Sequence, residues 1–443
     1  MKKYLRRILL LGMALLSYIS ISAKENIDDC SMMRTVPYLQ SPTQNSIIVR
    51  WVTKLDCHGL VEYGTDSIKV INGTGRKLTT NQPDVKTLTH RIKLTGLTPG
   101  QKYYYRVKSI FPDCNGQSGH SEYSKFYSFT AFDDSRDNFT MLIFNDLHPN
   151  LYDSQWLDSF ISLLSNTISG MKYDLVVFNG DCFDDFKKEE DIIFWLNKFS
   201  EFTNSFRVPA IYIAGNHEYR LAPASTYLPK PPCSDMLLEK YIEFVDNGSS
   251  YGTIRLGDSQ LLFLDTGENL YEANNFWAPD LENYIDCFYD YYCKQKQFIN
   301  DLKQDEKFMN ATKKILIHHI PFFEMSYKKE GQPDFYNPYF YIGGDILNSY
   351  LIDVSINGHT HAEYIINKNK YNTSIGKYHY HNAYPVYVAS GPNKLDVEDN
   401  HLEMIVLSKD KEKLLLTTHI LTACKKTIKE TKYKIEEGEL ITK

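Results

Sequence analysis

Apolar and polar residues alternate over short stretches between residue 30 and about residue 135. An alternation with a period of two predicts strands that bury one face. Turn-rich pieces such as "NGTGR" and "LTPGQ" separate these stretches, which read "SIIVRW", "LVEYG", "HRIKLTGL" and "YYYRVKSI". Short strands at this spacing predict an all-β antiparallel sandwich. The polar segment 132–138, "FDDSRDN", is predicted to be a linker.

A different pattern begins at residue 139. Continuous apolar runs now alternate with stretches of helical period, among them "SQWLDSFISLLSNTI", "EDIIFWLNKFSEF" and "KQKQFINDLKQ". Buried strands that alternate with amphipathic helices predict a layered α/β domain. The charged tail from about residue 421 fits either a last strand pair or a loose end, and the sequence leaves both open.

Residues 1–23 have the features of a signal peptide. Four basic residues precede the apolar run "ILLLGMALL", and small residues end at "ISA" before Lys24. This order predicts a segment that is removed on export, with an uncleaved membrane anchor as the alternative. No later stretch is long and apolar enough to span a bilayer. We therefore expect an exported protein, either periplasmic or secreted.

Composition restricts the class of partner. A chain of 443 residues with 42% hydrophobic residues can fill the cores of two or three domains. Its formal net charge is −6, and removal of the basic signal makes it more acidic, which argues against nucleic-acid polymers and anionic membranes as partners. In an oxidising compartment the eight cysteines could pair, for example Cys57 with Cys114 or Cys287 with Cys293.

Five predicted buried strands of the α/β region end in polar residues. "FTMLIF" is followed by Asn145, Asp146 and His148; "DLVVF" by Asn179, Asp181 and Asp184; "AIYIA" by Asn216, His217 and Glu218; "KKILI" by His318 and His319; and "DVSI" by Asn357, His359 and His361. In open α/β sheets the functional crevice lies outside the carboxyl ends of the strands. We therefore expect these side chains to converge.

The residue types at these ends suit a transition metal. Carboxylate, amide and imidazole donors without thiolate favour Zn²⁺, Mn²⁺ or Fe over Ca²⁺ or Cu(I). Seven candidate ligands are more than one ion needs, so two ions that share a bridging carboxylate are predicted. The candidates are Asp146, His148, Asp181, Asn216, His319, His359 and His361. The alternative for each is a structural hydrogen-bonding residue at a strand end, and His318 is the weaker candidate of the adjacent pair.

The pattern D-x-H … G-D-x-x-D … G-N-H-E … H-x-P … G-H-T-H resembles the calcineurin-like metallophosphoesterase superfamily over about residues 139–420. The stretches "VPYLQSPTQNSIIVRW" and "LTGLTPGQKYYYRV" look like the fibronectin type III-like domain that precedes the catalytic domain of purple acid phosphatases. The resemblance implies a fibronectin type III-like sandwich at 24–135 and a four-layer (α/β/β/α) metallophosphoesterase domain at 136–443.

The resemblance also implies roles. One metal would be held by Asp146, His148 and His361, and the other by Asn216, His319 and His359, with Asp181 bridging both. A metal-bound hydroxide would attack phosphorus in line. His217, which with Asn216 would also contact substrate, would protonate the leaving oxygen while Asp184 holds its tautomer; phosphate binding alone is the alternative role for His217.

The chain departs from the purple branch at two positions. Purple enzymes have glycine where this chain has His148, and tyrosine where it has Asp184, so an iron-tyrosinate centre is not expected. The predicted function is a binuclear phosphomonoesterase that acts on a small phosphorylated substrate. A phosphodiesterase or nucleotide pyrophosphatase is the alternative enzyme, and a β-sandwich module joined to a catalytically idle domain is the alternative from another class. Oligomeric state is left open.

Overall fold

The computed structural model describes residues 31–79, 86–112, 119–149, 154–183, 188–220, 237–245, 249–268, 281–323, 337–375, 378–392, 401–422 and 427–443. The predicted signal peptide, residues 1–23, lies outside these ranges, as does Asp184. Within the described ranges, no helix combines the length and the apolar character that crossing a bilayer would require.

The first part of the chain folds into strands, as its alternating pattern predicts. Its elements are β1 (Tyr38–Thr43), β2 (Ser46–Gly64), α2 (Ser67–Ile71), β3 (Arg76–Thr79), β4 (Thr87–Thr95), β5 (Lys102–Ile110), β6 (Ser121–Tyr123) and β7 (Tyr127–Thr130). The segments "SIIVRW" and "LVEYG", predicted as separate strands, both lie in the 19-residue β2. The prediction of a break was wrong because β2 continues through an irregularity between Val52 and Cys57, where its register with β4 shifts.

The second part is mixed α/β. Its first sheet-forming strands are β8 (Phe139–Phe144), β9 (Leu175–Asn179) and β10 (Ala210–Ile213), with helices α3 (Ser154–Ile168) and α4 (Glu189–Phe202) between them. The short 3₁₀ segments η2 (Glu218–Arg220) and η3 (Leu237–Lys240) follow β10. The three strands pair in parallel, β8 with β9 and β9 with β10. Their carboxyl ends therefore meet at one edge of the sheet.

A second sheet of six strands runs in the order β11-β12-β13-β14-β18-β15. Its strands are β11 (Gly252–Leu256), β12 (Ser259–Phe263), β13 (Lys313–Ile317), β14 (Val354–Asn357), β15 (Tyr364–Ile366) and β18 (Val386–Val388). The other elements of this part are α6 (Leu281–Asp301), η5 (Leu302–Gln304), α7 (Glu306–Met309), α8 (Pro338–Ile342), α9 (Gly344–Leu347), β16 (Asn372–Ile375) and β17 (Tyr378–His381). One buried apolar cluster contains residues from β8, β9 and β10 together with residues from β12, β13 and β14.

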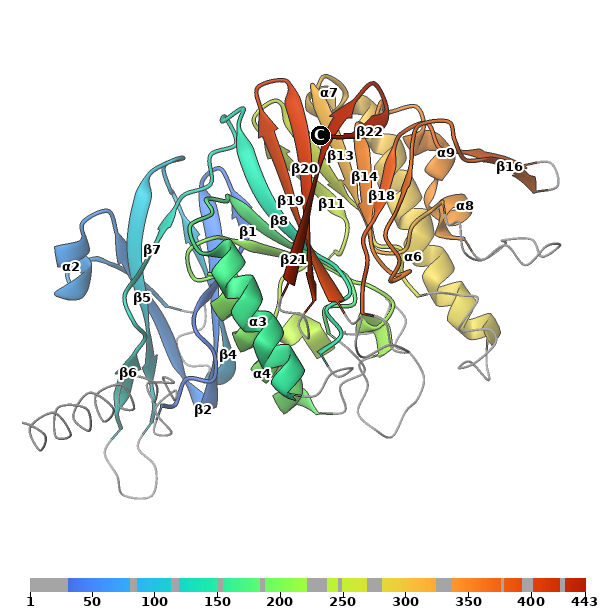
Figure 1. Cartoon of the computed structure of the whole chain (residues 1–443). Coiled ribbons are helices and arrows are strands. Elements are labelled where there is room, and N and C mark those ends of the chain that lie inside the picture. The colour runs from blue at the N-terminus through green and yellow to red at the C-terminus, as the bar shows by residue number, and fades with distance from the viewer. Residues whose placement is uncertain are drawn as a thin grey trace, which may run out of the picture.

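The charged tail forms strands. β19 (His401–Asp410), β20 (Lys413–Thr422), β21 (Thr427–Glu436) and β22 (Glu439–Thr442) pair in antiparallel fashion, and β19 pairs with β8. Of the two readings that the sequence left open, the last strand pair is therefore the one that the structure supports. Figure 1 shows these strands in red beside β8.

The β part of the chain is continuous with the α/β sheet. β1 pairs in parallel with β10 through Gln40 and Ala210, so the strands to the left in Figure 1 extend the β8-β9-β10 sheet at its β10 edge. Side chains strengthen this junction: Arg91 Nε donates to Glu243 Oε1 over 2.7 Å, and Arg50 forms a second ion pair with the same carboxylate. Covering an edge strand satisfies its backbone groups and removes a site of aggregation.

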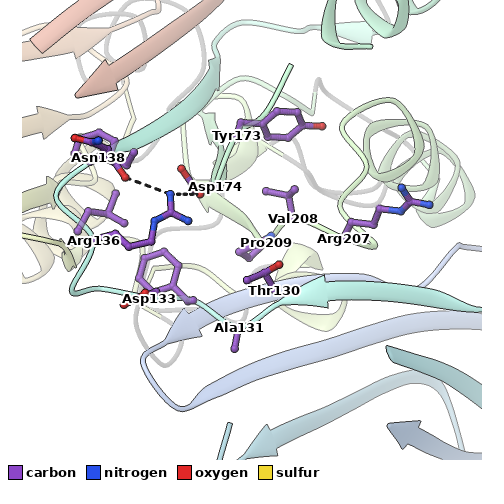
Figure 2. A pocket seen from close by; sticks show the side chains of 13 residues that line it. Thr130, Ala131, Asp133, Arg136, Asn138, Tyr173, Asp174, Arg207, Val208 and Pro209 are labelled. Carbon is purple, nitrogen blue, oxygen red and sulfur yellow. Dashed lines mark hydrogen bonds and ion pairs between the residues drawn. The ribbon is translucent and has the colours of Figure 1, made fainter. Parts of the chain in front are cut away.

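A pocket of about 160 Å³ lies at this junction, on the opposite edge from the strand ends discussed below (Figure 2). Its lining includes residues that directly precede β8, β9 and β10. Arg136 donates to Asp174 Oδ1 over 2.8 Å and to the Asn138 carbonyl over 3.2 Å. The Arg136 guanidinium is thus bonded to two other groups that line the pocket.

Neither cysteine pairing that the sequence left open forms. Cys57 carries a buried free thiol and Cys293 an exposed one, which excludes the Cys57–Cys114 and Cys287–Cys293 disulfides.

Candidate metal centre

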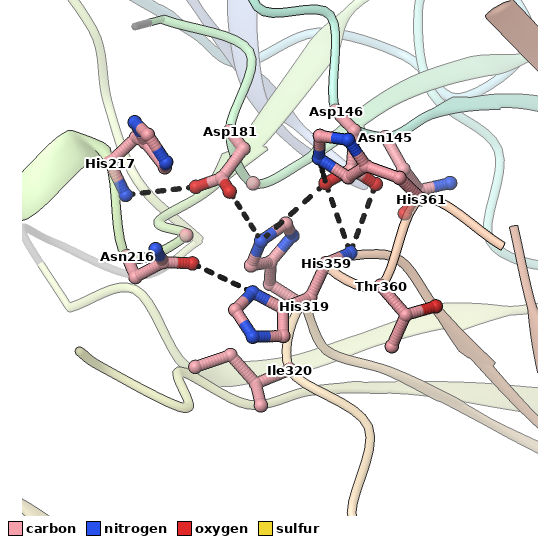
Figure 3. A network of polar contacts seen from close by, with 12 residues as sticks. Asn145, Asp146, Asp181, Asn216, His217, His319, Ile320, His359, Thr360 and His361 are labelled. Carbon is pink, nitrogen blue, oxygen red and sulfur yellow. Dashed lines mark hydrogen bonds and ion pairs between the residues drawn. The ribbon is translucent and has the colours of Figure 1, made fainter. Parts of the chain in front are cut away.

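The five polar strand ends converge, but from two sheets. β8, β9 and β10 bring Asp146 and His148, Asp181, and Asn216 from the first sheet. β13 and β14 bring His319, and His359 with His361, from the second. Figure 3 shows the Asp146, Asp181, His319 and His361 side chains pointing toward one another. All seven candidate ligands therefore lie in one region, as expected.

The backbone turns sharply at most of these positions. Asp146, His148, Asp181, His359 and His361 have φ values of 51°, 37°, 51°, 72° and 56°, which lie in the left-handed region. Each such residue costs on the order of 1–3 kcal/mol and persists only where its surroundings enforce it. Backbone hydrogen bonds between the strand ends do this: Asp146 N donates to the Gly180 carbonyl and His148 N to that of Asp181, each over 3.1 Å. Strain concentrated at one edge of two sheets points to a functional site.

The first group of donors consists of Asp146, His148 and His361, whose nearest ligand atoms lie within 4.8 Å of one another. His361 Nε2 lies 3.5 Å from Asp146 Oδ1 and 3.2 Å from His148 Nε2. His361 Nδ1 donates to the Pro392 carbonyl over 2.7 Å, which leaves Nε2 as the nitrogen with a lone pair. This is the tautomer that a metal ligand needs.

The second group consists of Asp181, His319 and His359, again with ligand atoms within 4.8 Å. His319 Nε2 lies 2.9 Å from Asp181 Oδ2, and His319 Nδ1 donates to the Asn179 carbonyl over 2.9 Å. His359 Nδ1 lies 2.9 Å from Asn216 Oδ1, so the amide joins this group.

Asp181 lies between the two groups. It belongs with His319 and His359, and it also lies within the same 4.8 Å limit of His148 and His217. Its two oxygens are used differently: Oδ2 faces His319, whereas Oδ1 accepts from the His217 backbone N–H over 2.9 Å. A carboxylate in this position can serve two cations.

Two glycines allow this close packing. A Cβ at Gly180, whose φ is 79°, would lie 2.4 Å from the His319 ring. A Cβ at Gly215 would lie 2.3 Å from Asp181 Oδ1 and 2.5 Å from the Asp181 nitrogen. Real Cβ atoms do not approach other atoms so closely. The G-D and G-N pairs of the sequence are thus required by the space around Asp181 and His319.

The electrostatics fit a cation site. Burial alone would raise the pKa of Asp146, but hydrogen bonding to His148 and the charge of His319 hold it well below its ordinary range. Burial would also raise the pKa of Asp181, but the charge of His319 and, to a smaller extent, that of His217 hold this pKa well below its ordinary value. Burial lowers the pKa of His319, but the Asp181 and Asp146 carboxylates raise it to about 9. Burial lowers the pKa of His359 to about 3.

Glu218 is a part of the site to which the sequence analysis assigned no role. Its buried carboxylate accepts backbone hydrogen bonds from Gly215, Asp181 and Phe183 over 2.7, 2.8 and 2.9 Å. Burial raises the pKa of Glu218 to about 7, and the Asp181 charge adds to this rise. Its position as the last letter of "GNHE" was the available signal. Glu218 ties the turn after β10 to the turn after β9.

The remaining sequence candidates differ in their placement. His217 is partly exposed, and its ring lies edge-on to that of His148 with centroids 4.6 Å apart. His318 instead hydrogen-bonds to the Ile320 carbonyl over 2.9 Å, and burial lowers its pKa to about 3. Asp184 lies outside the described residues. In the aromatic run 283–293, Phe288 and Tyr292 are buried in the core, which supports a packing role for these two rings.

Comparison with known proteins identifies the family. Residues 139–363, about half of the chain, match the description "Calcineurin-like phosphoesterase", and residues 35–131 match "Purple acid Phosphatase, N-terminal domain". No curated protein matches the sequence.

Several solved structures are similar in fold. PhoD aligns at 11% identity over 94% of this chain and 93% of its own, with a TM-score of 0.61. A Vps29 variant from Entamoeba histolytica aligns at 9% identity over 67% of this chain and 99% of its own, with a TM-score of 0.28. A cold-active protein-tyrosine phosphatase of a psychrophilic Shewanella aligns at 12% identity over 90% and 98%, also with a TM-score of 0.28. The likeness to PhoD concerns the fold.

The donor set is compatible with the metals that this family implies. Imidazole nitrogens and carboxylate oxygens meet within 4.8 Å in overlapping groups, and these donors suit Zn²⁺, Mn²⁺ or Fe. A catalytically idle domain, the alternative from another class, would have lost some of its metal ligands. None of the seven expected donors is missing from the cluster, so this alternative is not supported. The chain belongs to the calcineurin-like phosphoesterase family and is a metal-dependent phosphoesterase.

Proposed function

We propose that this protein is an exported phosphomonoesterase that works with two transition-metal ions, either Fe, Zn or Mn. The observation that carries the proposal is the convergence of two overlapping donor groups that share Asp181. One ion alone would leave several of these donors without a role. Support for export comes from the signal-like residues 1–23.

The ligand assignment follows the two groups. Asp146, His148 and His361, whose ligand atoms lie within 4.8 Å of one another, would hold the first ion. Asn216, His319 and His359 would hold the second, and Asp181 would serve both. When bound, such a pair of ions would supply a clamp for the phosphoryl group, a water activated near neutral pH and charge stabilisation for an in-line displacement.

The chain's own residues supply the proton. His217 is partly exposed at the border of the cluster, and its backbone N–H is fixed on Asp181 Oδ1. A ring held there can donate a proton to the leaving oxygen of a substrate bound between the ions. Asp184, three residues after Asp181, is assigned the role of orienting that ring. Asn216 and His217 would both contact the phosphate group of a bound substrate.

The preference for monoesters has one support. Residues 35–131 resemble the N-terminal domain of purple acid phosphatases, whose name states a phosphatase activity. A phosphodiesterase or nucleotide pyrophosphatase would use the same donors, so the substrate is a question for experiment. The partner is a small phosphorylated molecule rather than a nucleic-acid polymer.

The finer fold assignment belongs to the same proposal. We assign residues 24–135 to a fibronectin type III-like domain and residues 136–443 to a four-layer metallophosphoesterase domain. Two buried clusters support the layers: one joins the two sheets, and the other includes helix residues Phe160 and Ile299 with strand residues Phe144 and Leu316.

The deciding experiment measures metal content and activity on the same preparation. We expect close to two transition-metal ions per chain, loss of activity in chelator, and a higher kcat/KM for phosphate monoesters than for diesters or nucleotide pyrophosphates. Activity in excess chelator with no bound metal would refute the metal mechanism. A preference for diesters or pyrophosphates would replace the monoesterase assignment and leave the metal site standing.

A further inference from the structure

A sixth strand end touches the metal centre without supplying a ligand. β18 pairs in parallel with β14 and antiparallel with β15, so it contacts both strands that flank the turn bearing His359 and His361. The segment 390–392 continues from β18 against the site. A Cβ at Gly391 would lie 3.0 Å from Asp146 Cβ and 3.1 Å from the His361 ring.

This segment orients one ligand. The Pro392 carbonyl accepts the proton of His361 Nδ1 over 2.7 Å, and His361 Nε2 then faces Asp146 Oδ1. The outer hydrogen bond of a metal-binding histidine fixes both its ring orientation and its tautomer. The position of one carbonyl therefore decides whether His361 is ready to bind a metal.

Glu403, on β19, holds the start of this segment. Its Oε2 accepts from the Ser390 backbone N–H over 2.7 Å and from the Ser390 hydroxyl over 3.0 Å. Its Oε1 accepts from the Tyr387 hydroxyl, which also lies 3.1 Å from Glu363 Oε1. Tyr387 within β18 and Ser390, two residues past its end, are thus bonded to one side chain.

The location of this carboxylate makes a packing role a poor explanation. Glu403 is 1% exposed and lies within the apolar run "LEMIVL" of β19. Burial raises the pKa of Glu403 to about 7. An apolar side chain would fill this space without the cost of burying a carboxyl group. An apolar side chain, however, could not accept the hydrogen bond that the Ser390 backbone N–H donates to Glu403.

We propose that Glu403 is a positioning residue for the first of the two metal sites. It fixes Ser390, the short segment through Gly391 places the Pro392 carbonyl, and that carbonyl orients His361. The contacts of this segment run to Asp146 and His361, both assigned to the first ion. The inference rests on the proposed function, because it needs two metal sites, and it adds that one buried glutamate controls the affinity of one of them.

The test is a calorimetric titration of the chelator-treated full chain with Mn²⁺. Glu403→Leu removes the acceptor and should weaken one of two binding events by about 10–100-fold, the usual effect of losing an outer hydrogen-bond partner. Glu403→Gln should retain both events, because its amide oxygen can accept from Ser390 and its amide N–H can donate to the Tyr387 hydroxyl. Glu403→Asp, which keeps the charge but shortens the side chain, should weaken the same event and carries the test if the leucine variant does not fold.

Two further variants serve as controls, one that removes a metal ligand and one that only disturbs packing. His361→Ala should abolish the event that Glu403→Leu weakens. Leu407→Ala, at a fully buried position on the same strand, should lower the melting temperature and leave both metal affinities unchanged. The proposal is overturned if Glu403→Leu or Glu403→Asp binds both ions as wild type does, if both events weaken alike, or if Leu407→Ala reproduces the selective loss. A wild-type protein that binds fewer than two ions would instead refute the proposed function.

Discussion

Replacing Gly215 with alanine tests the metal centre by adding one methyl group and removing no ligand. The new Cβ would lie 2.3 Å from Asp181 Oδ1, 2.5 Å from the Asp181 nitrogen and 2.8 Å from His319 Cδ2. Ordinary contact begins at 3.4 Å, so the Asp181 carboxylate would be about 1 Å too close to the new Cβ. Rotating the Asp181 side chain does not relieve the contact with its backbone, so the turn itself must move.

The expected effect follows from that displacement. Misplacing a catalytic group by 1 Å costs about 10²-fold in rate, which corresponds to about 2.7 kcal/mol of transition-state stabilisation. The overpacked site should also lose about 1–3 kcal/mol of stability, which a domain of ordinary stability of about 5–15 kcal/mol withstands. We therefore expect Gly215→Ala to fold, to bind both metals more weakly and to lose about 10²-fold in kcat/KM.

The assay compares kcat/KM for a nitrophenyl phosphate with metal content at several metal concentrations. Gly64→Ala, at the end of β2, is the matched control. Its new Cβ would lie 3.4 Å from Val70 Cγ2, which is an ordinary contact, so this variant should behave as wild type. A Gly215→Ala protein with its full metal content and kcat/KM within about threefold of wild type would refute the assignment of Asp181 as the bridge.

The other predictions concern single residues. Asp181→Ala should weaken the binding of both metal ions by more than the 10–100-fold that is typical of losing a residue that only hydrogen-bonds to a ligand. Calorimetry that finds the affinity of one site unchanged would contradict the bridging role of Asp181. His217→Ala should slow hydrolysis of an alkyl phosphate by about 10²–10⁴-fold but that of an activated aryl phosphate far less; equal losses in kcat/KM would leave only phosphate binding for this residue. An iron-loaded protein should lack the purple tyrosinate band because residue 184 is aspartate, and a visible spectrum with that band would show the ligand set to be wrong. Glu403→Gln should increase the free energy of unfolding relative to wild type by about 3 kcal/mol at pH 8 and little at pH 4. The reason is that the pKa of Glu403 is about 7 in the folded state and 4.5 ordinarily, so wild type loses stability as the pH rises between these values. Denaturant titrations that give the same difference at both pH values would contradict this prediction.

The local pattern predicts the elements better than their pairing. The helix over Ser154–Ile168 and the strand over Phe139–Phe144 match the predicted segments residue for residue, because a period of 3.6 or a short buried run is a local property. The division of the strands between two sheets depends on contacts between residues far apart in the chain. The local pattern therefore predicts a crevice at strand ends, whereas an arrangement with two sheets was implied only by the resemblance to the metallophosphoesterase superfamily.

The same limit applies to the site. Ligand candidates were recognisable because each follows a strand in an unusual run of polar residues. Glu218 and Glu403 were given no role: the "GNHE" motif marks Glu218 without showing its partners, and a single glutamate in the apolar run "LEMIVL" gives no local sign at all. Their partners, the backbone N–H groups of Asp181 and Ser390, lie 37 and 13 residues away. Only the folded chain brings them together.

Each proposed metal set draws on both sheets, and this links metal binding to the core. Asp146 of the first sheet faces His361 of the second, and Asn216 of the first faces His359 of the second. The distance between such donors is set by the apolar cluster that joins the sheets. An ion bound by donors from both sheets would therefore link the two sheets at their carboxyl edges, and binding to the folded state alone would stabilise that state by RT ln(1 + [metal]/Kd). If the ion binds only when the sheets are packed, the strained left-handed turns at this edge would be supported both by the core beneath them and by the bound cation.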